Sequence, residues 1–144
     1  MAASHWLRIL LCGLITGFVW TLLSVIVLAV VGQEFVAAVP GGRLNAPGGQ
    51  HGLLFGLNLA QAVWGIWIYT VLRARFRPGW KTAAVAGFAW WVIVSLQSSK
   101  WAALVAVPFK AALALLVTTL PAIIVAMAVG AWCYERTNGR KLEG

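Results

Sequence analysis

The residues best suited to chemistry are two carboxamides, Asn58 and Gln61, within a long apolar stretch. They lie three positions apart, with Gly65 one turn further along, so a helix would place all three on one face. Away from water, these side chains need hydrogen-bond partners. We expect either interhelical hydrogen bonds or a polar lining for a substrate or ion path. The candidate partners in other stretches are Thr16, Ser24, Gln97, Thr118 and Thr119.

A second polar face combines Gln97, Lys100 and Trp101. A lysine at membrane depth indicates a functional site, whereas a lysine near a helix end extends its flexible stem to the surface. The distinction depends on whether this helix stops near Ser99 or continues to about Ala106. Lys100 lies within two turns of the end even of the longer helix, so we expect it to reach the outer surface.

No residue pattern predicts catalysis or metal binding. His51 is a lone histidine after a glycine-rich segment, which favours an interface residue over a ligand to a metal or pigment. Glu34, Glu135 and Glu143 fall in predicted loops or tails. That placement disfavours a proton-coupled exporter of the small multidrug type, which needs a carboxylate in the membrane. A phosphate-cradling loop and a nucleophile beside a base are also missing. We therefore expect a non-enzymatic protein with no cofactor and no catalytic, cofactor-binding or metal-binding residue.

The two cysteines, Cys12 and Cys133, both fall near predicted cytoplasmic ends of apolar stretches. Thiols stay reduced in the cytoplasm, which disfavours a structural disulfide. We also expect that the paired thiols of a membrane oxidoreductase are missing.

The elements that would position these residues are membrane spans. Of 144 residues, 62% are hydrophobic and 10% are charged, and the mean hydropathy is +0.89. A soluble domain of this size cannot bury so much apolar surface, and a helix crosses the hydrocarbon with roughly 20 apolar residues. We predict an all-α integral membrane bundle of four transmembrane helices in a single domain, 1–144. The expected spans are about 6–31, 51–72, 82–99 or 82–106, and 109–134.

The first apolar run, from Ile9 to Gly32, is longer than the core of a signal peptide, so we expect it to be retained as a span. Basic residues then predict the orientation, because short cytoplasmic loops are enriched in Lys and Arg. The predicted cytoplasmic side carries Arg8, Arg73, Arg75, Arg77, Lys81, Arg136, Arg140 and Lys141, and the predicted outer side carries Arg43, Lys100 and Lys110. Both termini are therefore predicted to be cytoplasmic. The net charge of +8 fits anionic lipid head groups at these ends rather than nucleic acid.

Small residues four positions apart indicate faces on which membrane helices pack closely. Each predicted span has such a pair, and the pairs are Gly13 with Gly17, Gly52 with Gly56, Ala83 with Gly87, and Ala126 with Gly130. We expect a tightly packed bundle. Whether these faces bind one another or another subunit stays open.

Three segments carry a resemblance to a known family. They are the polar turn 57–62, the stretch 81–87 that begins the third span, and the small-residue end of the last span, 130–132. Together with a long first span and a Gly/Pro-rich outer loop, they make the chain similar to small four-span proteins of bacterial inner membranes. The resemblance implies a location in the bacterial inner (plasma) membrane and implies no activity. Lys100 departs from that pattern.

Three functional hypotheses follow. The first is a non-enzymatic membrane protein whose partners, besides the lipid bilayer, are copies of itself or a larger membrane complex. The alternative is a small transporter or channel, with Asn58, Gln61, Gln97 and Lys100 along a polar path. The third is a membrane enzyme or cofactor-binding subunit that uses His51.

Overall fold

The computed structural model describes residues 2–33, 37, 48–104 and 107–139, which form four long helices. They are α1 (Ala2–Val31), α3 (Gly48–Arg75), α4 (Trp80–Leu104) and α5 (Phe109–Gly139). All four are long and apolar enough to cross a membrane, and these described ranges contain no strand. The all-helical class and the four apolar helices are as predicted. Helix α4 continues through Lys100 to Leu104, close to the longer of the two ranges considered for this span.

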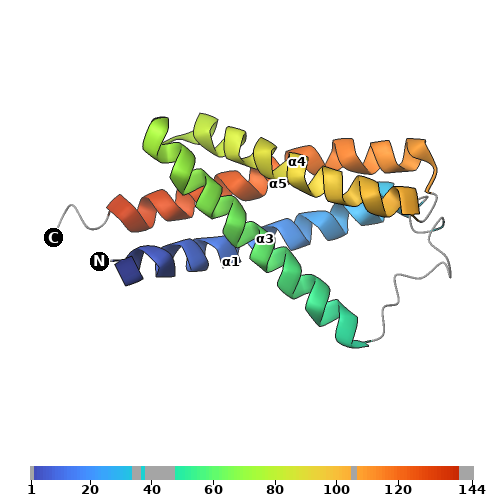
Figure 1. Ribbon diagram of the computed structural model, residues 1–144, viewed down its shortest axis with the longest axis horizontal. Coiled ribbons are helices and arrows are strands. Elements are labelled where there is room, and N and C mark those ends of the chain that lie inside the picture. The colour runs from blue at the N-terminus through green and yellow to red at the C-terminus, as the bar shows by residue number, and fades with distance from the viewer. Residues whose placement is uncertain (1, 34–36, 38–47, 105–106, 140–144) are drawn as a thin grey trace.

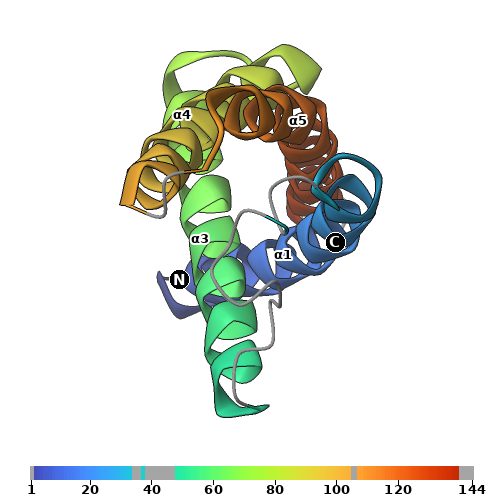
Figure 2. The same ribbon diagram turned by 90° about the vertical axis from the view of Figure 1, so that its right-hand side faces the viewer.

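The helices form an antiparallel bundle in which α1 packs between α3 and α5, and α4 packs on α5 and α3 (Figures 1 and 2). The start of α1, the end of α5 and the turn between α3 and α4 lie at one end of the bundle, which we call the inner end (Figure 1). Helix α3 crosses the others obliquely. Its first half therefore diverges from the bundle at the opposite, outer end (Figure 1).

The turn at the inner end reverses the chain between Arg75 and Trp80. Gly79 has a φ of 152°, a backbone conformation that residues other than glycine rarely adopt. The Thr82 hydroxyl donates a hydrogen bond to the Arg77 carbonyl at 2.7 Å, which closes the turn onto the first residues of α4.

The two halves of the chain repeat each other, a relation that the sequence analysis missed. The pattern Gly-Phe-x-Trp occurs at 17–20 in α1 and again at 87–90 in α4. The pattern Gly-x-Trp-x-Tyr occurs at 65–69 in α3 and again at 130–134 in α5. In both pairs the Gly is buried or closely packed and the final aromatic residue is buried. Helices α1 and α3 therefore form one helix pair, and α4 and α5 form a second version of the same pair.

The packing follows the repeat. A Cβ on Gly17 would meet Leu59 and Ala62, and one on Gly87 would meet Ile124 and Met127, which are the repeat-equivalent positions. The final aromatic residues of each pattern meet across the bundle: the ring centroids of Trp20 and Trp90 lie 5.7 Å apart, and those of Tyr69 and Tyr134 lie 6.3 Å apart. These matched contacts indicate an approximate two-fold axis that passes between the aromatic pairs.

The core is dense in the inner half of the bundle. Its large, fully buried side chains include Ile9, Ile66, Tyr69, Ile123 and Met127. Small residues between them let the helices approach closely, because lipid supplies no hydrophobic force that would hold more loosely packed helices together.

Candidate functional site: a polar cavity in the outer half of the bundle

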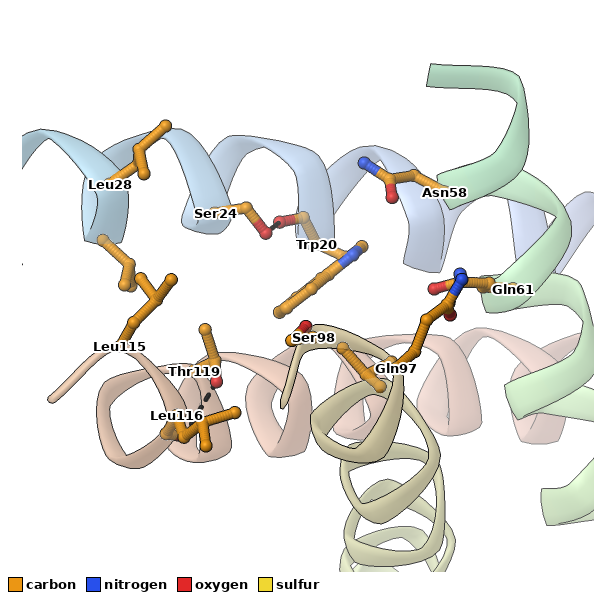
Figure 3. Close-up of a pocket in the computed structure, with 12 residues that line it drawn as sticks. Trp20, Ser24, Leu28, Asn58, Gln61, Gln97, Ser98, Leu115, Leu116 and Thr119 are labelled. Carbon is orange, nitrogen blue, oxygen red and sulfur yellow. Dashed lines mark hydrogen bonds between the residues drawn. The ribbon is translucent and has the colours of Figure 1, made fainter. Parts of the chain in front are cut away.

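A cavity of about 380 Å³ lies in the outer half of the bundle and receives side chains from all four helices (Figure 3). Its lining comprises Trp20, Ser24, Val27, Leu28, Asn58, Gln61, Val94, Gln97, Ser98, Leu115, Leu116 and Thr119. It exists because α3 diverges here from the bundle, whereas the inner half is filled by the core.

The first helices of the two halves, α1 and α4, contribute equivalent positions to the cavity. Three lining positions of α1 (Ser24, Val27 and Leu28) are the repeat equivalents of three lining positions of α4, which are Val94, Gln97 and Ser98. The Trp20 ring, which packs on Trp90, lies at the middle of the cavity (Figure 3). Helices α1 and α4 therefore contribute the same stretch to the cavity wall, whereas the lining positions of α3 and α5 do not correspond.

The two walls nevertheless differ in polarity. On the α3 and α4 side the cavity is lined by Asn58, Gln61, Gln97 and Ser98, and on the α1 and α5 side mainly by Val27, Leu28, Leu115 and Leu116. The repeat equivalents of the four polar residues are Ile123, Ala126, Val27 and Leu28, all apolar. Because this helix pair packs with apolar residues at those positions, packing alone does not require the carboxamides. The internal repeat is the sequence signal that could have found this site.

The structure brings Asn58, Gln61 and Gln97 together, three of the four residues that the sequence analysis placed on a polar path (Figure 3). Gln61 Nε2 donates to Gln97 Oε1 at 3.3 Å, which is one of the interhelical hydrogen bonds expected. Lys100 is exposed on α4 and is not part of the cavity lining. Asn58 carries a further carboxamide into the cavity from α3.

The hydroxyl groups considered as partners donate instead within their own helices. Ser24 donates to the Trp20 carbonyl at 2.8 Å and Thr119 to the Leu116 carbonyl at 2.8 Å. Thr16 donates to the Cys12 carbonyl at 2.7 Å, and Thr118 donates to the carbonyls of Ala114 and Leu115. Such bonds to the preceding turn are a regular alternative for Ser and Thr in helices.

The Trp20 indole provides the most unusual feature of the cavity. The side chain is only 6% exposed, and its Nε1–H has no hydrogen-bond partner among the described residues. The Nε1–H of Trp90, whose ring packs on Trp20, is also buried and has no partner among the described residues. Leaving a buried donor unpaired costs roughly 1–3 kcal/mol. Because the Trp20 Nε1 atom is itself sealed by its neighbours, a molecule in the cavity contacts the indole ring rather than this donor.

The predicted helix-packing glycines differ in what they contact. A Cβ on Gly13, Gly17, Gly87 or Gly130 would meet atoms of a neighbouring helix, whereas one on Gly52 or Gly56 would meet nothing within 4 Å. Gly52 and Gly56 lie in the half of α3 that diverges, so their face is open. Gly65, which the small-residue pairs did not include, faces Trp90 and Met127 across the axis.

The inner end holds a polar cluster that the sequence analysis did not anticipate. Glu135, expected in a tail, lies within α5, where its Oε1 accepts from Tyr69 Oη at 2.9 Å and pairs with Arg73 Nε at 2.9 Å. The Tyr134 hydroxyl lies 3.2 Å from His5 Nδ1. These contacts tie α3, α5 and α1 together at the inner end. The side chain of His51 lies outside the described residues.

Two further findings concern the expected chemistry. Among the residues that the structure describes, no group of three or more His, Cys, Asp or Glu side chains could hold a metal ion. The sequence analysis did not anticipate that Cys12 Sγ and Cys133 Sγ lie 3.1 Å apart, and both cysteines are free. Antiparallel packing of the first and last helices brings together cysteines that are far apart in the chain.

Comparison of the chain with models of protein families, with curated proteins and with solved structures found no match.

Proposed function

We propose that this chain is a multi-pass protein of the bacterial inner membrane, with both termini in the cytoplasm, that binds a neutral amphipathic small molecule without catalysis. Four apolar helices of sufficient length support membrane insertion. Basic residues are more numerous at the inner end of the bundle, where Arg75 and Arg77 lie at the turn between α3 and α4. This excess supports the orientation. The position of the start of α1 and the end of α5 at the inner end of the bundle is consistent with it.

The observation that carries the binding proposal is the set of three carboxamides, Asn58, Gln61 and Gln97, that line a cavity between apolar helices. Buried polar groups in proteins are almost always paired, and the hydrogen bond from Gln61 to Gln97 uses only one donor and one acceptor of these side chains. The remaining carboxamide donors and acceptors suit a ligand with polar atoms. A ligand with carbonyl, ester or ether oxygens suits these groups.

The lining also defines the rest of the ligand. Among the described residues, no charged side chain lines the cavity, which favours a neutral ligand over an ion. One polar wall and one apolar wall favour an amphipathic molecule, and about 380 Å³ falls in the range of small-molecule pockets. Between Trp20 and Trp90 and the inner end of the bundle, the described core is tightly packed. This packing favours binding over a continuous path for transport.

Binding of decyl-ubiquinone, a neutral probe with carbonyl acceptors and an apolar chain, tests this proposal. We expect saturable binding of the radiolabelled probe to the full chain in nanodiscs. Asn58→Leu and Gln61→Leu should each weaken it about five- to tenfold, because one hydrogen bond contributes about 1 kcal/mol. The matched control is Gln33→Leu, since Gln33 is exposed just after the end of α1 and is not part of the cavity lining.

Decylbenzene, which has the chain but lacks acceptors, should bind far less than the quinone. Equal binding of the two probes would show that only apolar partitioning is measured. Unchanged affinity in both Asn58→Leu and Gln61→Leu would remove the carboxamides from the site.

A second candidate function, self-association, has its own observation. The diverging half of α3 exposes Gly52 and Gly56, which meet no other part of the described chain, beside the exposed Phe55 and Leu57. Small residues in this pattern let a second helix approach closely.

Self-association through this face should appear in cross-linking. With both natural cysteines replaced by serine, Gly56→Cys should give disulfide-linked dimers in membranes, while Val85→Cys, on the exposed side of α4, should not. Equal dimer yields from both positions would indicate random collision rather than an interface.

A further inference from the structure

The thiols of Cys12 and Cys133 form a close pair between α1 and α5. Their Sγ atoms lie 3.1 Å apart, and both cysteines are free. A disulfide bond needs about 2.05 Å between the sulfur atoms. The pair is therefore within roughly 1 Å of bonding distance, which small side-chain rotations can cover.

The two helices hold this pair in register from both directions. One turn toward the outer end, Gly130 packs directly against Thr16, so the helix backbones approach closely. One to two turns toward the inner end, the Tyr134 hydroxyl contacts His5 Nδ1 at 3.2 Å. Contacts on either side of the cysteines keep their sulfur atoms together.

The internal repeat indicates that packing does not require sulfur at these positions. The repeat equivalents of Cys12 and Cys133 are Thr82 of α4 and Ile68 of α3. Thr82 is buried like Cys12, and its hydroxyl is bonded within its own turn. A small residue without a thiol thus fills the equivalent site.

The two thiols differ in access. Cys12 is 1% exposed, whereas Cys133 is partly exposed. Cys133 lies within about one turn of Thr137, where the apolar span of α5 ends, so a reagent at the inner end of the bundle can reach it. Cys12 is buried beside the Cys133 sulfur. This is the arrangement of an attacking and a resolving thiol.

We propose that Cys12 and Cys133 are a redox-active dithiol that a small-molecule disulfide converts to an intramolecular disulfide joining α1 to α5. The Cys133 thiolate attacks the small disulfide, breaks its S–S bond, and forms a mixed disulfide while one thiolate leaves. Cys12, after losing its proton, attacks Cys133 Sγ and displaces the second thiolate. Each cysteine loses one proton, and the small disulfide is reduced to two thiols.

The product would link the first helix covalently to the last. Such a bond restricts the unfolded chain over nearly its full length and also fixes the α1–α5 contact. Because the exchange is reversible, thiols reverse it. This inference is independent of the ligand proposed for the outer cavity.

Treatment of the full chain in nanodiscs with oxidised glutathione, followed by alkylation and intact-mass measurement, tests the proposal. We expect wild type to lose the mass of two hydrogen atoms, to resist alkylation at both cysteines, and to recover both thiols in dithiothreitol. Oxidised wild type should also unfold at a higher temperature than the reduced protein.

Single substitutions separate the two roles. Cys12→Thr, which copies the repeat-equivalent residue, should accumulate a stable glutathione adduct on Cys133. Cys133→Ser should acquire no adduct, because Cys12 is buried. Their melting temperatures in the reduced state report whether each variant is folded. A persistent adduct on wild type, cross-linked dimers in place of the internal bond, or an adduct on Cys12 in folded Cys133→Ser would overturn the proposal.

Discussion

Replacement of Gly13 by alanine is expected to lower the free energy of unfolding by about 1–3 kcal/mol, the usual cost of overpacking a tight contact. The added Cβ would lie 2.7 Å from Val63 Cα, a backbone atom that cannot move without shifting α3 against α1. The measurement is thermal unfolding in one detergent, followed by tryptophan fluorescence.

The matched control is Gly56→Ala in α3, measured on the dispersed monomer, which makes the same chemical change where an added Cβ would meet no atom of another described helix within 4 Å. Alanine forms helices better than glycine, so this variant should be unchanged or gain up to about 1 kcal/mol. Equal losses from Gly13→Ala and Gly56→Ala would contradict the packing of α1 on α3 described above.

Truncation of Trp90 to alanine should have the largest effect on stability, a loss of about 3–5 kcal/mol, as for other buried aromatic residues. Trp90 is 3% exposed and packs on Trp20 at the centre of the bundle, beside Gly65. Its removal leaves a cavity between the two repeat halves. Unfolding by a graded denaturing detergent, monitored by circular dichroism, measures the loss.

Two comparisons assign the effect to the buried contact. Trp64→Ala removes the same side chain from a position that is 62% exposed, and we expect a change within about 0.5 kcal/mol. Trp90→Phe keeps most of the ring volume and removes the unpaired Nε1–H, so its loss should be much smaller than that of Trp90→Ala. If Trp64→Ala were as harmful as Trp90→Ala, the Trp20–Trp90 contact would not be the centre of the core.

The sequence was sufficient to predict the four helices, because their length and apolar character are local properties. Helix α4 shows the limit of this reasoning. Its polar segment 97–100 made the end of the span ambiguous, and the helix in fact continues to Leu104. The shared face of Asn58 and Gln61 followed from helical periodicity, and both residues line the cavity.

Helix spacing alone could not predict which faces pack. The pairs Gly13 with Gly17 and Gly52 with Gly56 have the same spacing, yet the first pair packs against α3 and the second is open. The difference arises from the oblique crossing of α3, which carries its outer half away from α1. A crossing angle depends on how two surfaces fit together, and a single helix sequence does not contain it.

What the sequence by itself determined is therefore the set of helices and the residues that share each helix face, since these depend on neighbours within a few positions. The tertiary structure alone decided that Cys12 meets Cys133, that Glu135 meets Arg73 and Tyr69, and that Asn58, Gln61 and Gln97 line one cavity. Each of these depends on contacts between distant segments, and such contacts form only when four helices settle into one common packing arrangement.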